Sequence, residues 1–141
     1  NNVSDNDTDS DVEMTSSMIE NICIMVVDDE PGITSFITEL LIKICYKVLA
    51  FNDPLAALEA FTSEPDSIDI VITDQTMPNM TGAELAHELL TLRPALPVML
   101  CTGYSENVNE DEAQNLGISK FLKKPVDTGE LLRTIATLLT R

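Results

Sequence analysis

The chain has 141 residues, 44% of them hydrophobic, which suits one domain whose folding buries roughly two-thirds of the surface of the unfolded chain. Its 24 acidic residues outnumber its 8 lysines and arginines, and the net charge of -16 repels phosphate backbones and argues against direct binding of nucleic acid. The longest apolar runs are about six residues, far below the ~20 that span a bilayer, and the N-terminus lacks a signal-like segment. We therefore expect a cytoplasmic domain that makes no contact with a membrane.

Residues 1–20 differ in composition from the rest of the chain. They are acidic, contain no basic residue and are rich in Ser, Thr and Asn, so they cannot bury enough apolar surface to offset the cost of ordering. We expect a flexible linker or tail there and one domain at residues 21–141. Because the chain begins with Asn1 rather than Met, we also expect it to be part of a longer polypeptide.

From Ile22 onward, short apolar runs that are typical of buried strands alternate with longer runs of helical periodicity. The expected strands are residues 22–27, 48–51, 68–73, 97–101 and 120–123. Such alternation is typical of a parallel sheet covered by helices on both faces. Because crossovers between parallel strands are right-handed, the sequence predicts an α/β fold with a doubly wound sheet.

The first two strands are each followed by a segment with an apolar stripe. Behind Pro31, apolar residues recur at offsets of three and four, namely Ile33, Phe36, Ile37, Leu40, Leu41 and Ile44. In the second segment Asp53 is the expected helix cap, and the expected inner face is Leu55, Leu58 and Phe61. Both stripes predict helices that pack on the sheet.

Three more helices are expected after the third, fourth and fifth strands. A loop at residues 75–81 leads into a helix that extends to Leu92, and a weakly amphipathic helix at residues 105–116 ends at Gly117. In the last helix Asp127 and Glu130 have the spacing of a capping box. The apolar stripe behind them is Leu131, Leu132, Ile135, Leu138 and Leu139.

Charged residues stand at the ends of three expected strands. Asp28 and Asp29 follow the first strand, Asp74 the third and Lys124 the fifth. Ligands bind at the carboxyl edge of an open parallel sheet, so we expect these side chains to meet in one pocket. Two unit charges ~5 Å apart repel by roughly 3 kcal/mol at an effective dielectric constant of ~20, so the carboxylates need a cation. Short carboxylates are hard oxygen ligands that suit Mg²⁺.

Phosphoryl transfer is the chemistry that best uses such a pocket. With Mg²⁺ bound, one carboxylate can attack phosphorus and become an aspartyl phosphate, while Lys124 neutralises one phosphoryl oxygen. Thr102, at the end of the fourth strand, can donate its hydroxyl to another oxygen. The alternative for the first pair of acids is a solvated turn in which Asp29 or Glu30 caps the first helix.

Four segments of the chain resemble a known family. They are residues 26–30 (Val-Val-Asp-Asp-Glu), 74–82 (Asp-Gln-Thr-Met-Pro-Asn-Met-Thr-Gly), 100–103 (Leu-Cys-Thr-Gly) and 121–125 (Phe-Leu-Lys-Lys-Pro). With these motifs, residues 22–141 resemble the receiver domains of response regulators in two-component signalling. The resemblance implies a flavodoxin-like five-stranded sheet of strand order 2-1-3-4-5.

The resemblance implies a role for each residue of the acidic pocket. Asp74 is the expected phosphoryl acceptor, and Lys124 is the expected phosphate-binding lysine. Asp28, Asp29 and Asp74 are the expected carboxylate ligands of Mg²⁺, and the main-chain carbonyl of Thr76 is a further expected ligand.

The same resemblance implies residues that switch and tune the domain. Thr102 and Phe121 match the family's switch pair. Thr76 and Tyr104 flank the route of an attacking water, and we expect them to set the lifetime of the phosphorylated state. Lys123 is the alternative phosphate-binding lysine. Because successive side chains of a strand point to opposite faces, we expect its side chain to point away from the face to which Lys124 points.

As a receiver, the domain would take its phosphoryl group from a histidine kinase or a histidine phosphotransfer domain. It would catalyse only its own phosphorylation and dephosphorylation. The sequence leaves open whether the domain also forms a weak homodimer. Residues 100–106 look like those of receivers in hybrid sensor histidine kinases, so we expect such a parent protein. A stand-alone receiver, or one trimmed from a regulator with an output domain, is the alternative.

Two other classes of protein fit the sequence less well. Residues 74–76 superficially match the Asp-x-Thr motif of Mg-dependent phosphatases that form an aspartyl phosphate. However, Met77 and Pro78 follow instead of Gly-Thr, and the length leaves no room for a cap domain. In a flavin-binding module of this topology, the acids at the sheet edge would repel the flavin's phosphate.

Overall fold

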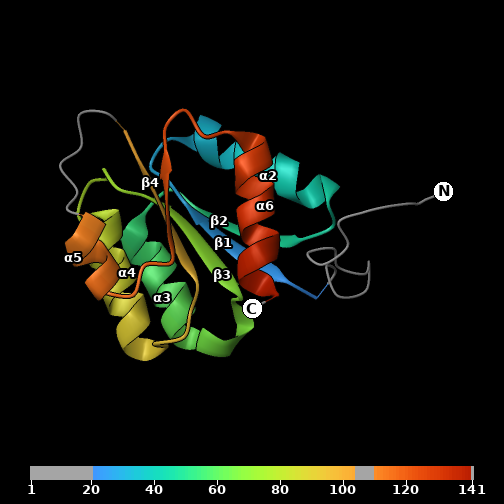
Figure 1. The fold of residues 1–141 in the computed structure, drawn as a ribbon. Helices are drawn as coiled ribbons and strands as arrows, with labels where there is room; N and C mark the ends of the chain where they lie inside the picture. The colour runs from blue at the N-terminus through green and yellow to red at the C-terminus, as the bar shows by residue number, and fades with distance from the viewer. Residues whose placement is uncertain (1–20, 104–109, 141) are drawn as a thin grey trace.

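The computed structural model describes residues 21–103 and 110–140, and all five expected strands form within them. These strands are β1 (Cys23–Val27), β2 (Lys47–Phe51), β3 (Ile70–Asp74), β4 (Val98–Thr102) and β5 (Lys120–Lys123). They pair in parallel in the order β2-β1-β3-β4-β5 (Figure 1). The predicted doubly wound, flavodoxin-like fold of strand order 2-1-3-4-5 is therefore confirmed.

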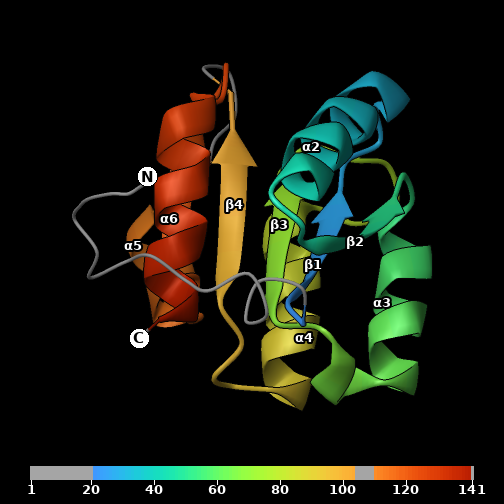
Figure 2. The same ribbon diagram turned by 90° about the vertical axis from the view of Figure 1, so that its right-hand side faces the viewer.

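Helices cover both faces of this sheet. They are α2 (Pro31–Lys43), α3 (Pro54–Ser63), α4 (Gly82–Leu92), α5 (Glu110–Asn115) and α6 (Thr128–Leu139), with a short 3-10 turn η2 (Pro65–Ser67) before β3. Two views of the ribbon place α2 and α6 on one face and α3, α4 and α5 on the other (Figures 1 and 2). In the part of the chain that the structure describes, no helix is long and apolar enough to cross a bilayer.

The core has two halves, one on each side of the sheet, because successive strand residues point to opposite faces. Met25 of β1 belongs to the half that contains Leu89 of α4. Its neighbour Ile24 belongs to the half that contains Leu41 of α2 and Ile135 of α6. All residues of β3 and β4 are buried, as expected for central strands covered on both faces.

Two apolar residues assigned to inner helix faces are wrong predictions. Phe36 is 57% exposed and Leu55 is 47% exposed. Successive helical residues are about 100° apart, so with Ile37 and Leu41 facing the sheet, Phe36 falls on the flank of α2. In α3 the buried residues are Pro54, Ala57 and Phe61, and Leu55 lies about 200° around the helix from Ala57. The periodicity of apolar residues identified each stripe but did not show which of its residues face the sheet.

The starts of three helices are fixed by side-chain caps. Asp53 and Asp127 each accept a hydrogen bond from a first-turn N–H, at 3.0 and 3.1 Å, as their spacing predicts. Glu130 does not complete a capping box, because its carboxylate pairs with a lysine of β5. The complete capping box is in α4, where Thr81 Oγ1 accepts from Glu84 N–H and Glu84 Oε1 accepts from Thr81 N–H. This capping box was not among the expected helix caps.

The expected fourth helix is described only in its second half, as α5. Its first expected residues, 105–109, lie outside the described part of the chain. Gly117 ends the helix region with a φ of 99°, a left-handed conformation that glycine adopts without strain. The predicted stop signal is therefore confirmed.

Both ends of the domain lie at the amino edge of the sheet, opposite the strand ends that carry charges. A hollow of about 420 Å³ at this edge is lined by Ile22, which precedes β1, and by Leu139, the last residue of α6. Pro97 and Ser119, which directly precede β4 and β5, line the same hollow.

Candidate functional site

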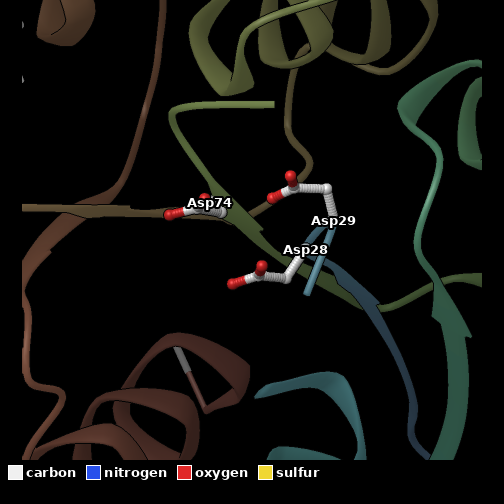
Figure 3. Close-up of side chains that lie close together, drawn as sticks. All are labelled: Asp28, Asp29 and Asp74. Atoms are coloured by element: carbon white, nitrogen blue, oxygen red, sulfur yellow. The ribbon is translucent and has the colours of Figure 1, made fainter. Parts of the chain in front are cut away.

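Three aspartates meet at the carboxyl edge of the sheet because their strands are neighbours. β1 and β3 pair in parallel with Val27 opposite Thr73, so the residues that follow emerge side by side. One ligand atom from each of Asp28, Asp29 and Asp74 lies within 4.8 Å of the others. Figure 3 shows the carboxylates of these residues extending to the same side of the strand ends.

This acidic cluster is partly withdrawn from water. Asp28 and Asp74 are each only 4% exposed, and Asp29 is half-buried. Burial, with a smaller contribution from the charges of Asp74 and Asp29, raises the pKa of Asp28 from 3.8 to about 6. A hydrogen bond from Glu30 N–H to Asp28 Oδ1 (2.9 Å) opposes this rise in pKa. Three hard oxygen donors with an excess of buried negative charge fit a divalent cation such as Mg²⁺.

The alternative of a helix-capping turn does not describe these acids. Glu30 occupies the N-cap position of α2, but its side chain makes no capping hydrogen bond. Instead Asp28 receives the N–H of Glu30, as described above. The alternative of a solvated turn in which Glu30 caps the helix is therefore wrong, because the Glu30 side chain makes no cap and Asp28 is buried.

A lysine reaches the cluster from the far side of β4. Lys124 follows β5 and forms an ion pair with Asp74 Oδ1. Its N–H donates to Thr102 O at 2.8 Å, which continues the pairing of β4 with β5, and its bond to Pro125 is cis. Lys123, the competing candidate, is exposed.

A threonine at the end of β4 completes the edge. Thr102 is 3% exposed, and no group in the described part of the chain forms a hydrogen bond with its hydroxyl oxygen. A buried hydroxyl without a partner is costly, so this atom is suited to a ligand that accepts a hydrogen bond. Phe121 of β5 lies opposite Leu100 and packs against the core half on the side of α3 and α4.

The structure describes only one of the two residues that are expected to set the lifetime of the phosphorylated state. Thr76 lies exposed in the loop between β3 and α4. Tyr104 lies outside the described residues. The structure thus brings together Asp28, Asp29, Asp74 and Lys124, with Thr102 at the adjacent strand end.

Sequence reasoning missed an amide that supports the acidic cluster. Asn52, directly after β2, donates through Nδ2 to Asp28 O (2.8 Å) and to Thr34 Oγ1 of α2 (3.0 Å). It therefore ties the loop that carries the first two acids to the neighbouring strand end. Its position immediately after a strand is the signal that could have found it.

A glycine at the start of α4 was also missed. A Cβ on Gly82 would overlap the main-chain oxygen of Asp74 and would lie 2.6 Å from Leu100 Cδ1. Only glycine lets the first turn of α4 sit this close to the end of β3. Its place directly after the expected loop is a signal that the sequence contains.

Comparison with known proteins decides the family. The sequence model of the response regulator receiver domain matches residues 24–136. The chain belongs to this family. The receiver domain has a relative in the putative two-component response regulator ARR21 of Arabidopsis thaliana, which is 32% identical over 83% of this chain.

Other relatives differ in the kind of protein that carries the receiver domain. The transcriptional regulatory protein CreB of Escherichia coli K12 is 31% identical over 84% of this chain. Hybrid signal transduction histidine kinase D of Dictyostelium discoideum is 32% identical over 83% of it. This chain spans 19% of ARR21, 51% of CreB and 8% of the kinase, so it corresponds to a part of each.

Solved structures agree with the receiver fold. A receiver domain protein from Clostridium thermocellum has a TM-score of 0.81 and 32% identity, over 85% of this chain and 95% of that one. Response regulator TrrA from Thermotoga maritima, solved in complex with Mg²⁺ and BeF, has a TM-score of 0.75 and 30% identity. That match covers 84% of this chain and 99% of TrrA.

Proposed function

We propose that this receiver domain accepts a phosphoryl group on Asp74 from a phosphohistidine, with Mg²⁺ bound beside it. The observation that carries the proposal is the ion pair of Lys124 with Asp74, at the edge where two further carboxylates gather. A lysine and an acidic cation site around one buried carboxylate match the charges that phosphoryl transfer must balance. As a domain, the chain would catalyse only its own phosphorylation and dephosphorylation.

The proposed metal ligands are Asp28, Asp29, Asp74 and the main-chain carbonyl of Thr76. When bound, Mg²⁺ would neutralise negative charge on the phosphoryl oxygens and on the carboxylates. The structure of TrrA with Mg²⁺ and BeF supports this proposal, because that relative has the same fold at 30% identity.

In the proposed reaction, a carboxylate oxygen of Asp74 attacks phosphorus in line with the nitrogen of the phosphohistidine. A P–O bond forms and the P–N bond breaks, and the electron pair of that bond stays on the imidazole nitrogen. Lys124 moves its charge from the carboxylate to a phosphoryl oxygen. Thr102 Oγ1 donates a hydrogen bond to another phosphoryl oxygen.

The same hydrogen bond would start the switch. When Thr102 turns toward the phosphoryl group, the half-buried ring of Phe121 can move into the space that it leaves. The surface formed by α5, β5 and α6 then changes. Moving the domain from ~1% to ~99% active requires about 5.5 kcal/mol, which a few charge-assisted hydrogen bonds of roughly 1.5–3 kcal/mol each can supply. Thr76 and Tyr104 are proposed to set how long this state lasts.

The partner is proposed to dock on α2, beside the acceptor. An apolar groove of about 230 Å³ runs between α2 and the start of α6, and Lys124 and Pro125 line it next to the site. Phe36, a member of the predicted apolar stripe of α2, lines this groove and is 57% exposed. An apolar groove next to the acceptor suits the apolar face of a helix that carries the phosphohistidine of a kinase or phosphotransfer domain.

The parent protein stays a prediction with two alternatives. The relative from Dictyostelium discoideum supports a hybrid sensor histidine kinase, whereas CreB supports a regulator with an output domain. The coding sequence on both sides of this segment decides between them. The cytoplasmic location belongs to the same prediction.

Intact-mass measurement tests the phosphoryl acceptor. Wild type and Asp74→Ala are incubated with Mg²⁺ and acetyl phosphate, with Asp66→Ala as a control because Asp66 is exposed in η2. Wild type and the control should gain one phosphoryl group per chain, and Asp74→Ala should gain none. Equal labelling of Asp74→Ala would refute the assignment, and repeated turnover of small phosphomonoesters would favour a phosphatase instead.

A further inference from the structure

One side chain closes the loop that carries Thr76. This loop, residues 76–81, bends through Asn79, which has a positive φ of 75°. Both ends of the loop are held by Gln75, because its main-chain oxygen accepts from Gly82 N–H and its side-chain Oε1 accepts from Ala83 N–H, each at 2.9 Å. The N–H of Gln75 donates to Cys101 O at 3.0 Å, which anchors it to β4.

These bonds complete the cap of α4. The first N–H groups of a helix have no partner within the helix. In α4, Gln75 takes those of Gly82 and Ala83, and Thr81 Oγ1 takes that of Glu84. The cap is therefore shared between the residue after the phosphoryl acceptor and the residue before the helix, and the loop between them is closed at both ends.

The chemistry of a carboxamide suits this position. Its oxygen accepts the Ala83 N–H without adding a fourth negative charge next to Asp74. The side chain of Asn is one methylene shorter, and apolar side chains offer no acceptor. Gln75 thus combines reach with neutrality beside a crowded acidic cluster.

We propose that Gln75 is a positioning residue that orients the main-chain carbonyl of Thr76 for Mg²⁺. This inference rests on the proposed function, in which that carbonyl is a metal ligand. Thr76 follows Gln75 directly, so the three hydrogen bonds of Gln75 fix the peptide unit from which the Thr76 main chain starts. The close packing of Gly82 on Asp74 holds the start of α4 against β3, so the N–H groups that bond to Gln75 stay in place.

The test compares variants with and without the acceptor. Gln75→Met keeps an unbranched side chain of similar length but loses the amide. Gln75→Leu, whose side chain is branched, is a second variant without the amide. Gln75→Glu keeps an acceptor oxygen at the same reach. Gln114→Met makes the same chemical change at an exposed position of α5. Calorimetry measures the affinity for Mg²⁺, and NMR hydrogen exchange measures protection of the Ala83 amide in metal-free protein.

Gln75→Met and Gln75→Leu should raise the dissociation constant for Mg²⁺ by about tenfold, the size of effect typical of residues that orient a metal ligand. Their Ala83 amide should exchange faster than in wild type. Phosphorylation by acetyl phosphate should slow at low Mg²⁺ and recover at saturating Mg²⁺. Gln75→Glu should keep the Ala83 protection and bind Mg²⁺ at least as tightly as wild type, because its added negative charge attracts the cation. Gln114→Met should match wild type throughout.

The inference is overturned if Ala83 exchanges faster in both apolar variants while their affinity for Mg²⁺ stays at the wild-type value. Gln75 would then be a helix cap without a role in the site. An equal loss of affinity in Gln114→Met would overturn it as well. The proposed function fails separately, if wild type binds Mg²⁺ but gains no phosphoryl group, and the affinity measurements on Gln75 still stand in that case.

Discussion

Lys124 forms an ion pair with Asp74 although their strands are not neighbours, since β4 lies between β3 and β5. The long side chain of the lysine crosses the end of β4 to reach Asp74. This places a positive charge on the side of Asp74 away from β1, the strand that leads into Asp28 and Asp29.

Removing this lysine charge should slow phosphorylation and leave the metal site in place. We expect Lys124→Met to lower the rate of phosphoryl uptake from acetyl phosphate by about 100-fold, the cost of losing one stabilising group in an anionic transition state. The control is Lys123→Met, because Lys123 is adjacent and exposed. Intact-mass time courses measure both rates, and equal rates in the two variants would contradict the role of Lys124.

Asp28 should make the metal-free protein less stable as the pH rises. Burial raises its pKa from 3.8 to about 6, so the folded state binds more protons than the unfolded state between these values. The free energy of unfolding should therefore fall as the pH rises through this window, by about 1.4 kcal/mol over the one unit between pH 5 and the folded-state pKa of about 6. Urea unfolding at pH 5 and pH 8 with a chelator measures it.

Asp28→Asn should remove most of this pH dependence and stabilise the metal-free protein at pH 8. It should also weaken binding of Mg²⁺, because one carboxylate ligand is lost. Asp66→Asn, at an exposed position, is the control and should keep the pH dependence of wild type. A slope that survives in Asp28→Asn would assign the effect to another group.

Gly82→Ala should destabilise the fold where the first turn of α4 meets β3. The added methyl group would overlap the main-chain oxygen of Asp74, so backbone has to move, at a cost of about 1–3 kcal/mol. Gly32→Ala is the matched control, because no atom lies within 4 Å of the Cβ that it would add to α2. The control should be neutral or slightly stabilising, and urea unfolding that ranks the two variants the other way would refute this packing.

Thr102→Val should stabilise the unphosphorylated domain by about 1 kcal/mol, because it removes a buried hydroxyl oxygen that has no partner among the described residues. The matched change Thr73→Val should destabilise by a similar amount, since Thr73 Oγ1 donates to Asp74 O at 3.0 Å. Urea unfolding in metal-free buffer compares them. Losses of equal size in both variants would mean that Thr102 Oγ1 has a partner after all.

The strands and the charged ends of three of them could be predicted from the sequence, because in these three the apolar run stops at a charged residue. Predicting that Asp28 and Asp74 lie close together required only this pattern and the rule that the carboxyl ends of parallel strands meet at one edge of the sheet. The burial of individual helix residues needed more, as Phe36 and Leu55 show, because a wide apolar stripe does not reveal which of its residues faces the sheet.

The hydrogen bonds of the supporting residues could not be predicted from the sequence, although the position of Asn52 directly after a strand is a signal. Asn52 and Gln75 act through hydrogen bonds to backbone that is 24 and 8 residues away in sequence, and the sequence does not state which loops will meet. The capping box of Thr81 and Glu84 was different. Its three-residue spacing is visible in the sequence, so this cap could have been predicted.

The hollow lined by Ile22 and Leu139 brings the first strand and the last helix of the domain to the same edge of the sheet. Because Ile22 and Leu139 lie at the opposite edge of the sheet from Asp74, a protein joined to the described domain beside either residue starts away from the proposed phosphorylation site. A fluorescent reporter fused at either terminus should accordingly leave the chemistry undisturbed.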